Sequence, residues 1–371
     1  MIVKRLLFLT LLATALGACG APTPAGTSSA ASTASAGTAG ETATPGAGTA
    51  GAASTSIAKT GTAGATTTAL EHVTVGLGYI PNVQFAPFYV AARKGYYAAE
   101  GLDVAFNYGG NVNDLLLQSA SGKLPFLIAA GDEVLVARTQ QIPVEMVFLL
   151  YQRPPVAVFS KQAAGITRPQ DLKGKTIGIP GRYGATYIGL RGLLYAAGLQ
   201  ESDVNLSEIG FTQFEAVSSG KVPVAVGYAN NEALRMQEAG MPVNVIKVGD
   251  YIQLVNNGIV VSEAYAAQHA DTVRKFVRAT QKGLEATLAN PDEAFKVSLT
   301  FIPELKADQQ PFQRKVLQDT LSYWHTADTD KQGLGWLNPP AWNTTYTFLR
   351  KSGILKQDTD PTKAFSSAFV K

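Results

Sequence analysis

The stretch HVTVGLGYIPNVQFAPFYVAARKG, residues 72–95, decides how the folded part of this chain begins. Its first residues alternate polar and apolar side chains, which predicts a β-strand over 72–77. A helix predicted over 84–94 places Phe85, Phe88 and Tyr89 on one face, and Gly95 is expected to end it. Strand, loop and helix in this order indicate the start of an α/β unit.

The same alternation continues towards the C-terminus. Further strands are predicted over 102–106, 126–129, 144–150, 156–159, 176–179, 204–209, 222–227 and 243–248. Helices are predicted between them, over 113–119, 132–139, 185–197, 212–219 and 230–239. From about residue 263 the pattern is nearly all helical, over 271–288, 292–301, 309–323 and 340–351. This alternation predicts parallel sheets of the α/β class.

The residues before this region have a different composition. Residues 1–18, MIVKRLLFLTLLATALGA, combine Lys4 and Arg5 with an apolar run and small residues, the pattern of a secretory signal peptide rather than of a membrane span. Cys19 then follows Leu16-Gly17-Ala18, and this sequence resembles the lipobox of bacterial lipoproteins, in which the cysteine is diacylated. The alternative is a secreted protein with an unmodified cysteine.

A segment of small residues follows Cys19. From Gly20 to about Ala69 the chain is almost wholly Ala, Gly, Thr, Ser and Pro, with Glu41 and Lys59 its only charges. Because it has little apolar surface to bury, burial cannot offset the entropy of ordering it. We therefore expect a flexible tether over 19–70. The signal peptide and tether also help to explain why only 16% of the 371 residues are charged, against a usual share of about 25%.

Composition excludes several function classes. The single cysteine excludes a disulfide framework and a multi-cysteine metal site. His72, His269 and His325 are far apart in the sequence, which argues against a histidine metal cluster. The net charge of +3 is too small for an electrostatic nucleic-acid binder. No G-x-S-x-G or H-E-x-x-H motif occurs. We therefore expect no catalytic residue, no metal and no cofactor.

Several motifs together resemble the type II periplasmic binding proteins. They are the loop Ile80-Pro81-Asn82, a helix ending in A-x-x-K-G-Y-Y at 91–97, E-G-L-D-V at 100–104, and DLKGKTIGI at 171–179, where the second lobe of such proteins usually begins. The resemblance covers about residues 71–371. It points to the class that binds nitrate, aliphatic sulfonates, thiamine pyrimidine precursors and riboflavin.

The resemblance implies a fold of two α/β lobes, with the ligand in the cleft between them and a hinge that closes around it. On that pattern lobe one is 71–155 plus 258–371, and lobe two is 156–257. The chain would cross near 153–155 and return near 256–258.

Ligands of open α/β sheets bind at the carboxyl ends of strands, so the loops that follow strands supply the candidate contacts. The candidates are Tyr79, Asn82, Phe85, Gly110, Asn111, Asp132, Gly181, Arg182, Tyr183, Thr186, Tyr228, Asn230, Glu232, Tyr251 and Asn257. For the loop after 222–227 the resemblance adds that an aromatic, an Asn and a Glu face the ligand in pyrimidine-precursor and riboflavin binders, which implies Tyr228, Asn230 and Glu232.

Some of these residues have a structural alternative. Asn82 suits a helix N-cap as well as a ligand contact. The negative charge of Asp132 suits the first turn of a helix, and for Asp132 this structural role is the favoured interpretation. Arg182 either clamps an anionic ligand or points to solvent. Tyr79 and Phe85 form either a stacking wall or part of the core.

The candidates are mostly aromatic and amide residues, with one cation. They suit a flat, uncharged heteroaromatic ring whose edge is read by hydrogen bonds, and they suit sulfonate or nitrate poorly. The opening loop departs from the L-D-W-x-P-N-x-x-H pattern of pyrimidine-precursor binders, because Gly78, Tyr79 and Phe85 replace the Asp, Trp and His. The larger apolar face favours riboflavin, with the thiamine pyrimidine precursor as the alternative.

The resemblance thus implies a substrate-binding lipoprotein of an ABC transporter. It would be a monomer anchored by a lipid on Cys19 to the extracytoplasmic face of the cell membrane, and would deliver its vitamin to permease and ATPase subunits. The enzyme alternative is a pyrimidine synthase of the same fold class, which consumes its own histidine and uses a cysteine-rich motif. Both features are missing here, since Phe85 stands at the histidine position.

Overall fold

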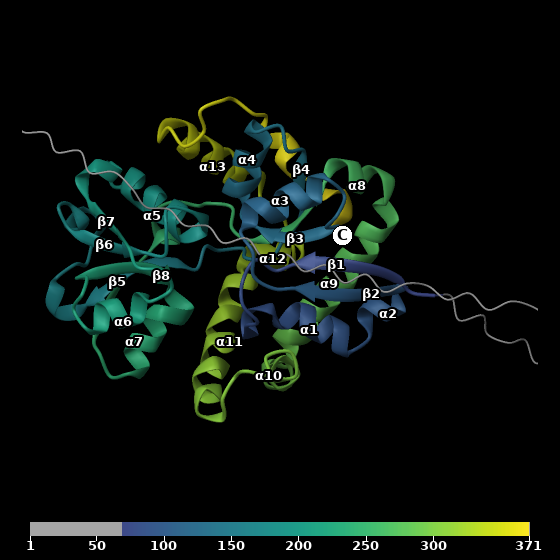
Figure 1. Cartoon of the computed structure of the whole chain (residues 1–371), viewed down its shortest axis with the longest axis horizontal. Coiled ribbons are helices and arrows are strands. Elements are labelled where there is room, and N and C mark those ends of the chain that lie inside the picture. The colour runs from purple at the N-terminus through teal and green to yellow at the C-terminus, as the bar shows by residue number, and fades with distance from the viewer. Residues whose placement is uncertain (1–68, 371) are drawn as a thin grey trace, which may run out of the picture. The chain divides into compact units, whose positions relative to one another are not determined.

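The structure is a computed structural model that describes residues 69–370. The predicted signal peptide, the lipidated Cys19 and nearly all of the predicted tether lie outside the described residues. The described residues contain two five-stranded sheets with helices packed on both faces of each sheet (Figure 1).

The first sheet takes its strands from two separate parts of the chain. Its order is β2-β1-β3-β10-β4. The strands are β1 (Glu71–Gly76), β2 (Leu102–Asn107), β3 (Phe126–Ala129), β4 (Val144–Leu149) and β10 (Gly258–Ser262). β1 is parallel to β2 and β3, whereas β10 is antiparallel to β3 and β4.

The second sheet repeats this plan with the order β7-β6-β8-β5-β9. The strands are β5 (Val156–Lys161), β6 (Thr176–Ile179), β7 (Asn205–Glu208), β8 (Val224–Tyr228) and β9 (Val243–Lys247). β6 is parallel to β7 and β8, and β5 is antiparallel to β8 and β9.

Both sheets are therefore mixed, and the expectation of parallel sheets was wrong for β5 and β10. Each of these strands is the first that the chain forms after crossing from the other sheet. A strand that follows a helix packed on its own sheet begins at the same end of the sheet as the preceding strand and runs parallel to it. A strand that enters from the other sheet begins at the opposite end and runs antiparallel. β10 itself was not predicted. The division into lobes at 155/156 and 257/258 stays a prediction.

The helices fill the connections between the strands. They are α1 (Ala86–Arg93), α2 (Tyr96–Ala99), α3 (Val112–Ala120), α4 (Gly131–Thr139), α5 (Gly184–Ala196), α6 (Gln213–Ser218), α7 (Leu234–Glu238), α8 (Glu263–Gln268), α9 (Ala270–Ala289), α10 (Pro291–Leu299), α11 (Gln310–Trp324), α12 (Ala327–Gln332) and α13 (Pro339–Lys351). None of the helices within residues 69–370 has the length and apolarity that a membrane span requires.

Two predicted helices are interrupted at their starts. The helix expected over 84–94 begins with a 3₁₀ turn, Val83–Phe85, before α1. The helix expected over 230–239 is divided into a π-helical turn, Ala229–Ala233, and α7. Such turns are common next to functional sites. The short helices α2, α8 and α12 were not predicted.

Helices cover each sheet on both faces, as Figure 1 shows for α5 on one face of the second sheet and α6 and α7 on the other. On the first sheet, the Phe126 ring of β3 stacks on the Phe276 ring of α9 with centroids 3.9 Å apart. α9 also packs against α1, where a Cβ at Gly283 would lie 2.1 Å from the carbonyl oxygen of Pro87. The two helices can approach this closely only because position 283 lacks a side chain.

We therefore expect Gly283→Ala to lower the free energy of unfolding by about 1–3 kcal/mol, although alanine favours a helix interior by about 1 kcal/mol. The matched control is Gly192→Ala in α5. There the nearest atom to a new Cβ is Leu254 Cδ1 at 2.9 Å, a side-chain end that can rotate, so we expect a smaller loss. Urea unfolding measures both variants. Equal stability of Gly283→Ala and the unsubstituted chain would contradict the close approach.

Candidate functional site

A cavity of about 530 Å³ lies at the carboxyl ends of strands from both sheets. The segments that line it follow β1, β2 and β3 in the first sheet and β6, β7 and β8 in the second. Lining residues are also found where the chain crosses between the sheets, at Leu150, Tyr151 and Asn257. Its size suits a small-molecule ligand.

Large apolar side chains surround this cavity and remain exposed. Ile80, Tyr183 and Phe211 are 60%, 51% and 64% exposed, and all three line the cavity. The Tyr79 ring, which follows β1, meets the Phe211 ring, which follows β7, edge to face with centroids 5.8 Å apart. The two sheets thus each supply an aromatic residue to one wall, and exposed apolar surface of this kind is typical of a ligand site.

Amide side chains supply the polar part of the lining. Asn82 Oδ1 accepts the N–H of Gln84 at 3.0 Å, so Asn82 caps the turn and keeps its Nδ2 hydrogens for other partners. Asn111 Oδ1 caps α3 in the same way, through the N–H of Asn113 at 2.9 Å. Gln84 Nε2 is buried and makes no hydrogen bond to the described residues. Other atoms of Gln84 line the cavity, whereas this nitrogen lies behind the wall.

The first sheet contributes one carboxyl group to the lining. Glu133, in the first turn of α4, lines the cavity, and its Oε2 accepts the N–H of Ala130 at 2.8 Å. Burial raises the pKa of Glu133 to about 7. The prediction had chosen its neighbour Asp132, which is buried outside the lining, and burial and the charge of Glu133 raise its pKa well above the usual range. Successive residues of a helix point about 100° apart, so only one of the two faces the cavity.

The second sheet contributes the other carboxyl group. Glu232 lies in the π-helical turn, where its Oε2 accepts the N–H of Tyr228 at 2.7 Å and its Oε1 accepts from Asn231 Nδ2 at 3.1 Å. Burial raises the pKa of Glu232. The pKa of the Tyr228 hydroxyl is also raised, first by burial and then by the charges of Glu133 and Glu232, so Tyr228 lies in the field of both carboxyl groups.

Asn230 does not line the cavity, which corrects the assignment made from the resemblance. Its side chain is fully buried against α11, where Nδ2 donates to Thr320 Oγ1 at 2.7 Å. Asn231 lines the cavity instead. The π-helical turn winds more residues per turn than an α-helix, which changes the direction of each side chain after Tyr228.

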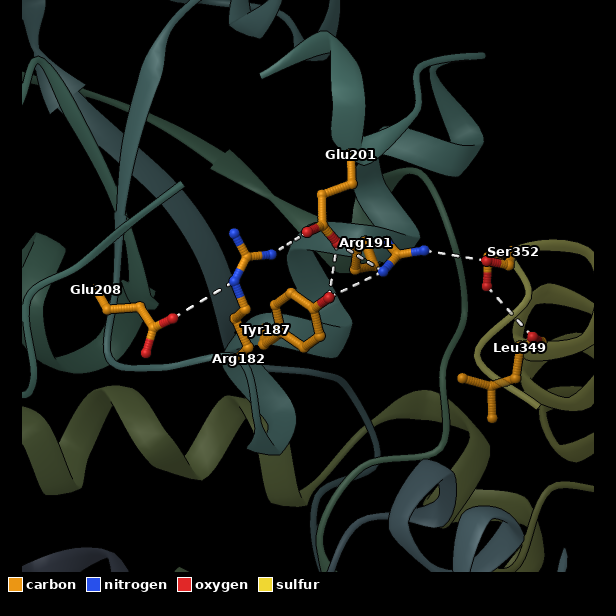
Figure 2. Close-up of polar contacts among 7 residues, drawn as sticks. All are labelled: Arg182, Tyr187, Arg191, Glu201, Glu208, Leu349 and Ser352. Atoms are coloured by element: carbon orange, nitrogen blue, oxygen red, sulfur yellow. Dashed lines mark hydrogen bonds and ion pairs between the residues drawn. The ribbon is translucent and has the colours of Figure 1, made fainter. Parts of the chain in front are cut away.

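Arg182 does not line the cavity, and Figure 2 shows its guanidinium between the carboxylates of Glu201 and Glu208. Its guanidinium pairs with Glu201, and its Nε lies 3.4 Å from Glu208 Oε1. Glu201 also accepts from Arg191 Nη1 at 2.7 Å, and Arg191 Nη2 reaches the carbonyl oxygen of Ser352 at 3.1 Å. The nearby acidic residues thus bind the cation that was a candidate clamp for an anionic ligand.

The remaining candidates divide between the lining and its surroundings. Gly181 and Tyr251 lie outside the lining: a Cβ at Gly181 would meet the Tyr183 ring, and the Tyr251 side chain is exposed. The candidates in the lining are Tyr79, Asn82, Phe85, Gly110, Asn111, Tyr183, Thr186, Tyr228, Glu232 and Asn257. Their contact with a ligand stays a prediction.

Sequence reasoning missed Gln84, Glu133, Tyr151, Phe211, Gln213 and Asn231, all of which line the cavity. The loop rule applies to Phe211 and Gln213 as well, because both follow β7. Glu133 directly follows the candidate Asp132, and only the direction of the side chain on the helix separates the two. Nothing in the local pattern marked Tyr151, which lies where the chain leaves the first sheet.

This chain is similar to several known binding proteins and to a group of synthases. The family model described as NMT1/THI5 like matches residues 82–294. The "Riboflavin-binding protein RibY" of Chloroflexus aurantiacus is 48% identical over 304 residues, which cover 81% of this chain and 86% of that protein. The "Formylaminopyrimidine-binding protein" of Halalkalibacterium halodurans is 31% identical, covering 81% and 91%. The yeast "4-amino-5-hydroxymethyl-2-methylpyrimidine phosphate synthase THI13" is 26% identical, covering 75% and 87%.

The fold is that of the periplasmic binding proteins, as the sequence motifs predicted. The crystal structure of the periplasmic nitrate-binding protein NrtA from Synechocystis superposes with a TM-score of 0.60 at 13% identity, covering 81% of this chain and 87% of that one. At 13% identity this similarity shows a shared fold and nothing about the ligand.

The raised pKa of Glu133 makes stability depend on pH. Between its ordinary value of 4.5 and about 7 the folded chain retains a proton that the unfolded chain has lost, so the free energy of unfolding falls as the pH rises through this range. We expect Glu133→Gln to remove part of this fall, on the order of 1 kcal/mol. Urea unfolding at pH 5 and pH 7.5 measures the difference between the two chains. Identical pH slopes would contradict a buried Glu133 carboxyl.

Proposed function

The chain belongs to the family described as NMT1/THI5 like, and from that premise we propose that it is an extracytoplasmic lipoprotein that binds riboflavin for uptake by an ABC transporter. At the coarser level it is a substrate-binding protein and not an enzyme. Its relatives at 48% and 31% identity are both named as binding proteins, whereas the synthase relative is less similar, at 26%.

The observation that carries this proposal is the chemistry of the cavity wall. Aromatic side chains from both sheets, among them Tyr79, Phe211 and Tyr228, provide flat apolar surfaces, and Asn82, Gln84 and Asn257 provide amides. Stacking surfaces combined with amide donors and acceptors suit a flat heteroaromatic ring with a polar edge. The wall contains no Lys, Arg or His among the described residues, so it offers no cationic side chain to a sulfonate or nitrate.

A second candidate ligand is the pyrimidine precursor of thiamine, which the formylaminopyrimidine-binding relative favours. The cavity supports the larger ring. Phe85 and Tyr79 stand where pyrimidine-precursor binders usually carry a histidine and a tryptophan, and exposed Phe211 and Tyr183 extend the apolar wall. The higher identity to the riboflavin-binding relative supports the same order.

Uptake by an ABC transporter requires a permease, an ATPase and a position of the binding protein at the outer face of the cell membrane. The lipobox-like sequence before Cys19 supports a lipid anchor at the outer face of the cell membrane, and the small-residue segment after it supports a tether that lets the folded part reach a permease and its ATPase. Both segments lie outside the described residues.

Titration of the purified chain with riboflavin, followed by quenching of flavin fluorescence, tests the ligand. We expect saturable quenching with one riboflavin per chain, and no displacement by formylaminopyrimidine added in excess. Absence of quenching, together with binding of formylaminopyrimidine measured by calorimetry, would replace riboflavin by the pyrimidine precursor.

The aromatic wall predicts which substitutions weaken binding. Tyr79→Ala and Phe211→Ala each remove a stacking face and apolar area from the cavity, and we expect each to raise the riboflavin Kd about tenfold or more. Tyr251→Ala is the matched control, because this exposed aromatic residue lies outside the lining and its loss is expected to leave Kd within about twofold. A larger effect at Tyr251 than at Phe211 would place the ligand elsewhere.

A further inference from the structure

The charges that line the cavity are all of one sign. Glu133 reaches it from the first sheet and Glu232 from the second, and no lining residue of the described chain is a Lys, Arg or His. A ligand bound between the two sheets therefore has a carboxyl group on each side. Tyr228 lines the same cavity, its backbone N–H donates to Glu232 Oε2 at 2.7 Å, and the charges of both carboxyl groups contribute to the raised pKa of its hydroxyl.

The positive ends of nearby helices are largely used by the protein itself. Three helices begin at the cavity wall: α3, α4 and α5. The side chain of Asn111 caps α3, and the carboxylate of Glu133 accepts a backbone N–H at the start of α4. At α4 and α5 the N-cap residue makes no side-chain hydrogen bond. The first N–H of α4, that of Gly131, donates to the carbonyl oxygen of Val255, which leaves α5 as the main positive helix end at the wall. The N–H groups at the start of α5 carry about half a positive charge, which is less than the negative charge of two ionised carboxylates.

The nearest cations are also engaged outside the cavity. Arg182 is paired with Glu201 and Glu208. Burial raises the pKa of Glu232, and the charge of Arg235 offsets part of this rise. Arg235 donates to Glu215 at 3.1 Å and lies over the Phe214 ring, 4.1 Å from its centroid. Neither arginine lines the cavity. No cationic side chain of the described residues therefore compensates Glu133 and Glu232 on the ligand side.

Resting on the proposed function, we propose that the cavity accepts the uncharged form of its flat heteroaromatic ligand and rejects the phosphorylated form, and that Glu133 and Glu232 enforce this selection. Both carboxyl groups keep acceptor capacity beyond their bonds within the chain, since each oxygen can accept two hydrogen bonds. They can bind the ring N–H and the hydroxyl groups of riboflavin. A phosphate is acceptor-only when ionised. Once both carboxyl groups are ionised, which for Glu133 requires a pH above about 7, the phosphate would face two like charges without a partner.

The test compares riboflavin with flavin mononucleotide, which differs from it by one phosphate and has the same fluorescent ring. We measure Kd for both on the full chain, on Glu133→Gln, on Glu232→Gln and on the double variant, by quenching at pH 8.5, which is above the pKa of about 7 of Glu133. Glutamine keeps the shape and one acceptor oxygen but removes the charge. Glu304→Gln, an exposed residue outside the lining, is the control for a charge change elsewhere.

We expect the unsubstituted chain and Glu304→Gln to bind riboflavin at least about tenfold more tightly than flavin mononucleotide, and the double variant to reduce this ratio to about threefold or less. Equal affinity of the unsubstituted chain for the two flavins would overturn the inference. A preference that survives unchanged in the double variant would also overturn it, because exclusion would then be steric rather than electrostatic.

A second ligand pair separates this inference from the proposed function. If riboflavin does not bind, the same chains are titrated by calorimetry with a hydroxymethyl aminopyrimidine and its phosphate ester. A preference for the unphosphorylated pyrimidine that is lost in the double variant would support the role of Glu133 and Glu232 while the riboflavin assignment fails. Absence of binding to both pairs would overturn the inference together with the proposed function.

Discussion

One backbone carbonyl fastens together the two segments that pass between the sheets. The oxygen of Asn257 accepts the N–H groups of both Leu150 and Tyr151, at 3.1 and 3.0 Å, so the outgoing and returning segments are held side by side. Leu150, Tyr151 and Asn257 all line the cavity, so this contact fixes part of its wall. The contact continues the antiparallel pairing of β4 and β10, in which Gly258 lies opposite Leu149. The carboxyl ends of the parallel strands in both sheets face the same cavity.

The cavity obtains its chemistry from the way the chain satisfies its own backbone there. Asn82, Asn111 and Glu133 each accept a backbone N–H at the start of a helix or turn, and each also lines the cavity. The Asn82 and Asn111 caps therefore use backbone donors that would otherwise attract an anion, and the lining presents amide and carboxyl groups to the ligand. This is a different use of helix N-termini from an anion site, and it agrees with the absence of basic residues from the described lining.

Local pattern was sufficient for most strands and helices, because their apolar periodicity is strong, as in β3, β6 and the long α9. It failed where contacts with neighbouring strands or helices determine the local structure. The run at 258–262 is a strand only because β3 and β4 flank it, and the helix expected at 230–239 is a π-helical turn where Asn230 bonds Thr320 of α11. At the site, the loop rule found Tyr79 and Tyr228 but gave Asp132 where Glu133 lines the cavity, and the resemblance gave Asn230 where Asn231 lines it. The side chains of adjacent residues in a turn point in different directions, and residue type alone does not predict these directions.

The sequence by itself determined the α/β class and the aromatic and amide character of the loops after the strands, because periodicity and residue type are local properties. The periplasmic-binding-protein fold followed from the resemblance of several motifs to that family. Only the tertiary structure decided which of these residues share the cavity. Arg182 was a candidate cation in the sequence, yet Glu201 and Glu208 hold it outside, and Phe211 meets Tyr79 although 132 residues separate them in the chain. Charge pairing and contact between sheets depend on distances in space that no local pattern encodes.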